Sequence, residues 1–234
     1  MFYYHKSHGK KTTGMTKQVS IDFNILCKKI LSCGFPVQIP KNVTFVTYEN
    51  SIKKTLIERI YNKLNIPHIV LAKNYKPWTW MGKIKPLLSY LESGQCKTKY
   101  IIATDSRDVA LIKDPKKIVE VFKSFDCCML FCNTVADWPK NNGYCLFEDV
   151  IYCHSCFHRH LSAGAFMAKV SPLKRYLQEI IIGYQNKRKW TYIGNKKFND
   201  QLAWRHMHKK YYPRIQVDAD KEIFCRFDSF RHEN

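Results

Sequence analysis

The chain has 234 residues, of which 45% are hydrophobic and 14% aromatic, and it carries a formal net charge of +20. This is enough apolar material for one packed domain, and the charge favours anionic partners such as nucleotides, nucleic acid or acidic surfaces. No run approaches the roughly 18 apolar residues that a transmembrane segment needs, and the N-terminus lacks the apolar block of a signal peptide. The expected location is therefore cytoplasmic, with a virus-encoded protein in the host cytoplasm as one alternative.

Residues 1–20 are polar, basic and without periodicity, which predicts a flexible N-terminal arm in front of a single domain over residues 21–234. From residue 42 onward, β-branched and aromatic runs alternate with amphipathic ones. Strands are predicted at residues 42–48, 68–72, 100–104 and 127–133. Helices are predicted at residues 51–64 (with Asn50 or Ser51 as cap), 83–92, 114–125, 171–184 and 198–207. This alternation indicates an α/β fold with a mixed, mostly parallel central sheet flanked by helices.

Two carboxylates, Asp105 and Asp108, directly follow the predicted strand YIIAT. Ligands of open α/β sheets bind at the carboxyl ends of the strands. Two acids on one tight turn can hold a divalent cation, whose remaining positions diphosphate oxygens would fill. An equally simple interpretation is that Asp105 caps the turn and Asp108 pairs with Arg107 or a lysine. Spacing alone leaves both interpretations open.

The turn after the first predicted strand, TYENS (residues 47–51), contains no glycine. Neither the G-x-G-x-x-G dinucleotide turn nor a P-loop can therefore lie there, and neither pattern occurs elsewhere in the sequence. A hydride-transfer enzyme or a P-loop kinase is thus not expected.

Several short motifs occur in an order that resembles a known family. They are TDSRDV (104–109), WP (138–139), LSAGAF (161–166), NDQL (199–202) and VDADKEIF (217–224). In this order they resemble the GT-A glycosyltransferases of the kind found as the glycosyltransferase domain of procollagen lysyl hydroxylases, over about Val43 to Phe227. The resemblance implies a GT-A-like fold and Mn²⁺ or Mg²⁺ as cofactor. It also implies transfer of a hexose from a UDP-sugar to an acceptor hydroxyl of a glycan, protein or lipid.

The resemblance also implies roles for individual residues. The metal ligands would be Asp105 and Asp108 together with Asp218 or Asp220, since Ala219 stands where the family often has its third ligand; of these two, Asp218 is preferred. The donor would contact Thr47, Tyr48, Glu49, Lys83, Thr104, Ser106, Trp138 and Gly164. Asp200 and Gln201 would lie near the transferred sugar, with Asp200 as general base for the acceptor or as an orienting group.

A different class of function is also compatible with the residues. In a Mg²⁺-dependent nuclease or nucleic-acid-binding protein, the basic surface would contact phosphate and Asp105, Asp108, Asp200 and Asp218 would hold the metal.

Three further features have simple structural interpretations. In CHSCFHRH, the pairs Cys153/Cys156 and His158/His160 are too close together for a tetrahedral zinc site, which needs a loop between ligand pairs. His206 and His208 are expected at the surface. Trp78 and Trp80 could stack on a sugar or base, or pack in the core.

Overall fold

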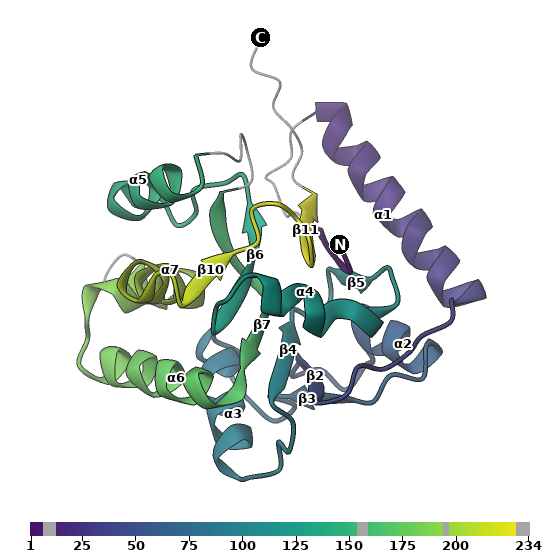
Figure 1. Ribbon diagram of the computed structural model, residues 1–234, viewed down its shortest axis with the longest axis horizontal. Coiled ribbons are helices and arrows are strands. Elements are labelled where there is room, and N and C mark those ends of the chain that lie inside the picture. The colour runs from purple at the N-terminus through teal and green to yellow at the C-terminus, as the bar shows by residue number, and fades with distance from the viewer. Residues whose placement is uncertain (7–12, 154–158, 194–196, 228–234) are drawn as a thin grey trace.

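A six-stranded sheet runs through the middle of the computed structural model, which describes residues 1–6, 13–153, 159–193 and 197–227 (Figure 1). In spatial order its strands are β10 (Ile215–Val217), β6 (Met129–Thr134), β7 (His160–Lys169), β4 (Tyr100–Thr104), β2 (Val43–Tyr48) and β3 (His68–Leu71). Only β7 runs antiparallel to its neighbours in this sheet. The mixed, mostly parallel sheet that the alternation predicted is confirmed.

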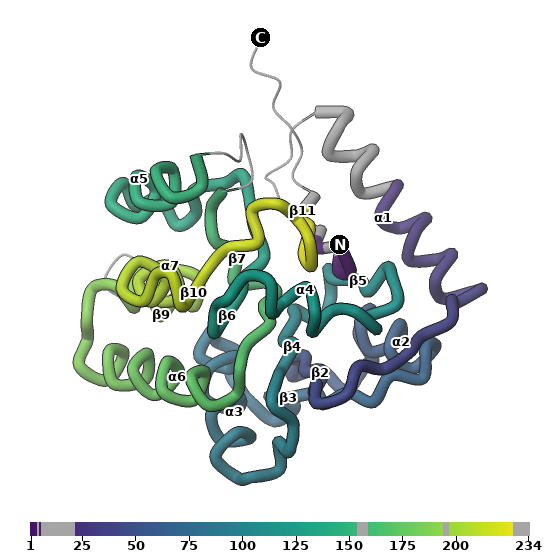
Figure 2. Tube along the Cα trace, in the orientation of Figure 1, coloured from purple at the N-terminus to yellow at the C-terminus, as the bar shows by residue number. Residues whose placement is uncertain are grey.

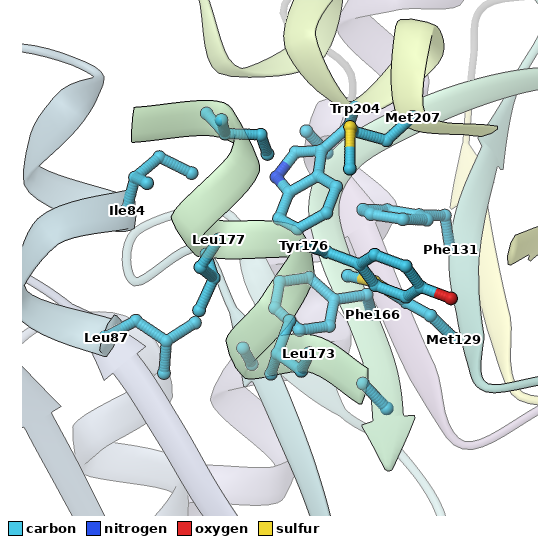
Figure 3. Packing of buried hydrophobic residues seen from close by; sticks show 14 of the residues in the cluster. Ile84, Leu87, Met129, Phe131, Phe166, Leu173, Tyr176, Leu177, Trp204 and Met207 are labelled. Atoms are coloured by element: carbon cyan, nitrogen blue, oxygen red, sulfur yellow. The ribbon is translucent and has the colours of Figure 1, made fainter. Parts of the chain in front are cut away.

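One face of the sheet is covered by α3 (Met81–Glu92), α6 (Val170–Gln185) and α7 (Asp200–Tyr211) (Figure 3). Side chains of β4 alternate between the two faces, so Ile101 and Ala103 point into this layer. Phe131 of β6 packs against Trp204 of α7, with ring centroids 5.2 Å apart. Because Asp200 begins α7, this apolar packing also fixes the position of the helix end that carries it.

The opposite face carries a second layer around α2 (Leu56–Lys63) and α4 (Ile118–Ser124), with α1 (Thr13–Cys33) packed against α2. The alternate residues of β4, Tyr100 and Ile102, belong to this second layer. The two layers and the sheet between them account for the near-continuous burial of β4 and β6. Strands buried on both faces are typical of sheets with helices on each side.

The helix expected from residue 51 begins later in the structure, at Leu56. The carboxylate of Glu58 accepts hydrogen bonds from the backbone N–H and the hydroxyl of Thr55, at 2.9 and 2.8 Å. This capping interaction starts the helix at Thr55, and Ile52 is left 97% exposed. A 3-10 turn (Pro115–Lys117), capped by Asp114, similarly precedes α4.

A second, three-stranded sheet joins the two ends of the chain. β1 (Tyr3–Lys6) lies between β11 (Phe224–Phe227), to which it is parallel, and β5 (Val109–Leu111), to which it is antiparallel. Figure 2 shows the N-terminus beside β5 and β11. Phe2 and Tyr3 are buried. In place of the flexible arm expected for residues 1–20, the structure therefore has a strand over residues 3–6 and the beginning of α1 from residue 13.

The remaining elements lie beside α7. They are α5 (Asn142–Ile151), the 3-10 turn Lys189–Thr191, β8 (Tyr192–Ile193) and β9 (Lys197–Phe198). The side chain of Asn141 caps α5 by accepting from the backbone N–H groups of Gly143 and Tyr144. Among the described helices, none is long and apolar enough to cross a membrane.

Candidate functional site

Two cavities meet at the turn that follows β4. Both are lined by Trp80, Lys83, Asp105 and Asp108. The first, of about 540 Å³, is also lined by His5, Trp138, Ser162, Ala163, Gly164, Asp200, Gln201 and Arg226. The second, of about 390 Å³, is also lined by Tyr48, Glu49, Asn50, Trp78, Ser106 and Arg107. The acidic turn predicted to be a site thus forms the boundary between two spaces at the carboxyl ends of β2 and β4.

Glu49, which follows β2, holds the acidic turn in place. Its carboxylate accepts a bidentate pair of hydrogen bonds from Arg107, both at 2.8 Å, and a third from the hydroxyl of Ser106 at 3.0 Å. The hydrogen bond from Arg107 is the main reason that the pKa of Glu49 falls to about 2. Since Arg107 is bound to Glu49, Asp105 and Asp108 on either side of it present their carboxylates to the cavities.

His5 of β1 reaches the same two carboxylates. Its Nε2 lies 3.3 Å from Oδ2 of Asp108 and 3.7 Å from Oδ2 of Asp105. The residue is only 5% exposed, and neither ring nitrogen has a hydrogen-bond partner among the described residues. Buried polar atoms are rarely left unpaired in folded proteins, so this imidazole has an unused donor or acceptor directed at the acids.

Gly164 of β7 makes room for this approach. A Cβ atom at this position would lie 2.5 Å from Nε2 of His5 and 3.1 Å from Oδ2 of Asp105. The backbone N–H of Asp105 also donates to the carbonyl of Gly164, at 2.7 Å. The missing side chain of Gly164 therefore allows His5 and Asp105 to meet over β7.

Lys83 connects Asp105 to Asp200. Its Nζ lies 2.5 Å from Oδ1 of Asp105 and 3.2 Å from Oδ2 of Asp200. Burial lowers the pKa of Lys83, but the two carboxylates outweigh burial and hold that pKa above its ordinary value. Burial raises the pKa of Asp200, against the opposing effect of Lys83. The buried carboxylate of Asp200 and the partly exposed one of Asp105 thus share one ammonium group.

Gln201 joins the first cavity to the loop before α5. Its Oε1 accepts from the backbone N–H of Ala163 at 3.3 Å, and its Nε2 donates to the carbonyl of Trp138. The indole of Trp138, 51% exposed, lines the first cavity. Arg226 of β11 donates to the hydroxyl of Ser162 at 3.2 Å and lines the same cavity.

Three predicted site residues, Thr47, Thr104 and Asp218, are not among the residues that line the two cavities. Thr47 is fully buried and donates to the carbonyl of Thr104, so this pair links β2 to β4 behind the site. The carboxylate of Asp218, also fully buried, accepts from the backbone N–H groups of Glu222, Ile223 and Phe224 at 2.7 to 2.9 Å. Asp218 thus stabilises the turn before β11. The third potential metal ligand beside Asp105 and Asp108 is His5.

The group formed by His5, Asp105 and Asp108 fits a divalent cation. One potential ligand atom from each residue can be chosen so that all lie within 4.8 Å of one another. Carboxylates suit divalent cations such as Mg²⁺ and Mn²⁺, and an imidazole is a further possible ligand. The unpaired ring nitrogens of His5 support this fit. Sequence reasoning missed His5 because residues 1–20 were assigned to an arm, although FYYHK has the aromatic content of a strand.

No protein-family model and no curated protein sequence matches the chain. Among solved structures, it is similar to the crystal structure of mouse xyloside xylosyltransferase 1 in the apo form. The TM-score is 0.43 and the sequence identity is 12%, over 92% of this chain and 82% of that chain. At this level of similarity the comparison carries no argument about chemistry, which rests on the residues described above.

Proposed function

We propose that the protein is a metal-dependent glycosyltransferase that transfers a sugar from a nucleotide-sugar donor, UDP-linked, to an acceptor hydroxyl. The observation that carries this proposal is the position of Asp105 and Asp108 between two cavities. A nucleotide sugar consists of a nucleoside and a sugar joined by a diphosphate. The second cavity would take the nucleoside beside Tyr48 and Glu49, and the first would take the sugar beside Gly164, Asp200 and Gln201.

Asp105, Asp108 and His5 would hold the cation, which would neutralise charge on the departing nucleoside diphosphate. Lys83 and Arg226 add two positive side chains to the lining of the first cavity. A diphosphate that bound there would compete with Asp105 and Asp200 for the ammonium group of Lys83. Asp200, once released from Lys83, would accept the proton of the acceptor hydroxyl, a role that suits a carboxylate with a raised pKa.

The alternative of a Mg²⁺-dependent nuclease has less support. It requires Asp105, Asp108, Asp200 and Asp218 at one metal centre without a nucleoside pocket. The carboxylate of Asp218 is bound to three backbone N–H groups, and that of Asp200 to Lys83. The second cavity, beside Tyr48, is the space that a nucleoside would need.

The test is a thermal-shift titration with UDP plus Mn²⁺ against a short oligonucleotide plus Mg²⁺, followed by mass-spectrometric detection of UDP-sugar hydrolysis. We expect stabilisation by UDP and Mn²⁺ together, and loss of hydrolysis in Asp105→Asn and Asp108→Asn. Asp22→Asn, on the exposed side of α1, is the matched control and should retain activity. Stabilisation by the oligonucleotide alone, or full hydrolysis in both site variants, would overturn the proposal.

A further inference from the structure

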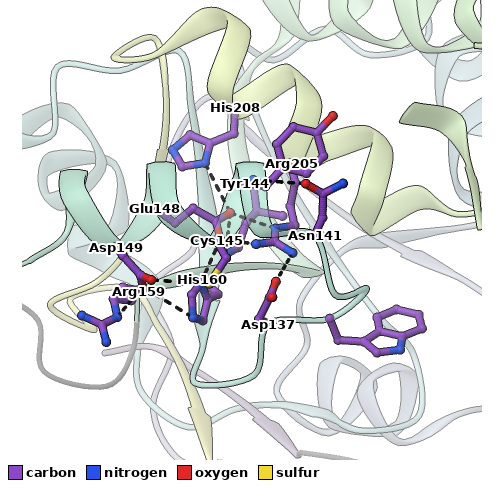
Figure 4. A network of polar contacts seen from close by, with 12 residues as sticks. Asp137, Asn141, Tyr144, Cys145, Glu148, Asp149, Arg159, His160, Arg205 and His208 are labelled. Carbon is purple, nitrogen blue, oxygen red and sulfur yellow. Dashed lines mark hydrogen bonds and ion pairs between the residues drawn. The ribbon is translucent and has the colours of Figure 1, made fainter. Parts of the chain in front are cut away.

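A second group of potential metal ligands lies at the start of β7, on residues that the proposed transfer reaction does not use. It consists of Cys145 and Asp149 of α5 and His160 of β7 (Figure 4). One ligand atom from each can be chosen so that all lie within 4.8 Å of one another. Cys145 and Asp149 are one helical turn apart and therefore lie on the same face of α5.

The distances within the group are close to those of a metal centre. Sγ of Cys145 lies 3.4 Å from Oδ2 of Asp149, and Nε2 of His160 lies 3.9 Å from Oδ1 of Asp149. Ligands of a tetrahedral Zn²⁺, bound at about 2.0 to 2.3 Å, lie about 3.5 Å apart. The group needs only small side-chain movements to reach that geometry.

Glu148 gives the imidazole the orientation of a metal ligand. Its Oε2 lies 2.9 Å from Nδ1 of His160, and both side chains are buried. A histidine that donates Nδ1–H to a carboxylate keeps a lone pair on Nε2, and metal-binding histidines commonly have such a partner. Here Nε2 is directed at Asp149. Glu148 is itself fixed by Arg205, at 2.7 and 3.1 Å.

We propose that Cys145, Asp149 and His160 bind a zinc ion. A thiolate, a carboxylate and an imidazole form a mixed sulfur, oxygen and nitrogen set that suits Zn²⁺ better than Mg²⁺ or Ca²⁺. The thiolate and carboxylate together balance the charge of the ion. Nε of Arg159 lies 2.8 Å from Oδ1 of Asp149, and can keep that contact while Oδ2, which faces Cys145, binds the metal.

This zinc site would fasten α5 to β7. Among its described contacts, α5 packs on β7 and α7, while Leu146 and Val150 on its outer side are 67% and 64% exposed. The helix follows the loop that carries Trp138 to the first cavity. A metal that joins Cys145 and Asp149 to His160 would hold α5 in place, and with it the end of the Trp138 loop that leads into this helix. This set differs from Cys153, Cys156, His158 and His160, whose middle members lie outside the described residues.

The test uses Co²⁺ as a spectroscopic probe for Zn²⁺, with the full chain first freed of metal by a chelator. We expect one equivalent of Co²⁺ to give thiolate-to-cobalt charge-transfer absorption that Zn²⁺ abolishes. The absorption should be lost in Cys145→Ser and retained in the matched control Cys96→Ser, a half-buried thiol that contacts Thr44 and Thr98. Asp105→Asn should also retain it, because the group around the acidic turn contains no thiol.

A second variant guards against misfolding of Cys145→Ser. Asp149 is 35% exposed at its side chain, so Asp149→Asn should fold and should bind Zn²⁺ at least about tenfold more weakly in competition with a chromogenic chelator. Equimolar Zn²⁺ should raise the melting temperature of the unmodified protein but not that of Asp149→Asn. Absence of the absorption, or its persistence in Cys145→Ser, would overturn the proposal, as would unchanged Zn²⁺ affinity in Asp149→Asn.

Discussion

His5 occupies the space that a side chain at Gly164 would fill: a Cβ atom there would lie 2.5 Å from Nε2 of the imidazole. The two residues come from different sheets, His5 from β1 and Gly164 from β7. Their contact therefore fixes how the small sheet meets the central one at the candidate metal centre.

Gly164→Ala should reduce sugar-nucleotide hydrolysis strongly and weaken Mn²⁺ binding, because the added methyl group would push His5 away from Asp105 and Asp108. A contact of 2.5 Å is shorter than real Cβ contacts, so the imidazole of His5 must shift. The matched control is Gly143→Ala in α5, where the nearest atom would be 3.5 Å from the new Cβ. Activity is measured as UDP release, and equal activity in both variants would contradict the role assigned to Gly164.

His5→Ala should raise the Mn²⁺ concentration needed for half-maximal activity by about tenfold or more, as expected when one of three metal ligands is lost. The fold should persist, since removing His5 removes two buried ring nitrogens that have no hydrogen-bond partner among the described residues. His68→Gln, on the edge strand β3, is the control. An unchanged Mn²⁺ requirement in His5→Ala would show that the histidine is not a ligand.

Lys83→Met should destabilise the fold by about 3 to 5 kcal/mol at neutral pH, because Asp200 would be left as a buried carboxylate without its partner. Adding Asp200→Asn should recover most of this loss, since the double variant has no unpaired charge at that position. Urea unfolding of both single variants and the double variant measures the coupling. Additive losses in the double variant would mean that Lys83 and Asp200 do not interact in solution.

Glu148 should give the fold a distinct sensitivity to acid. Burial raises its pKa, but hydrogen bonds from His160 and Arg205, together with the nearby His208, outweigh burial and lower the pKa from 4.5 to about 2. A carboxylate whose pKa is lower in the folded than in the unfolded state stabilises the fold when the pH is above the unfolded-state pKa. This contribution of Glu148 is therefore complete above about pH 4.5 and is lost as the pH falls towards 2. The expected loss is about 3 kcal/mol.

The measurement is urea unfolding between pH 6 and the lowest pH at which the protein still folds. Glu148→Gln should be less stable throughout and should have a shallower pH dependence below about pH 4.5. Glu120→Gln, at an exposed position of α4, is the matched control and should follow the unmodified curve. Parallel curves for the unmodified protein and Glu148→Gln would contradict the role of this carboxylate.

The sequence was sufficient to predict the elements whose pattern is local. The strand runs at residues 42–48 and 100–104 and the helix that begins at Asp200 all have the expected type. Asp105 and Asp108 were placed correctly at a strand end, because a buried run followed by acids can only deliver them to the edge of the sheet. The same reasoning missed β7, since HLSAGAFMAK is buried on both faces and has small residues where an alternating pattern would otherwise appear.

The parts that were wrong depend on distant partners. His208 was expected at the surface, but it is fully buried and hydrogen-bonded to the hydroxyl of Tyr152 at 3.0 Å. Asp218 was favoured as a metal ligand, but in the structure its carboxylate accepts hydrogen bonds from three backbone N–H groups of the turn before β11. The pairing of Tyr3 with Phe224 has no local signal at either residue, so the place of His5 beside the acidic turn could not be predicted.

That pairing has a consequence for the order of folding. β1 lies between β5 and β11, so it gains its parallel neighbour only when a segment more than two hundred residues away in the chain has been synthesised. Contacts of such high sequence separation form slowly. A nascent chain can therefore have its acidic turn and both helical layers in place while His5 is still unanchored, and metal binding would mark the last step of maturation.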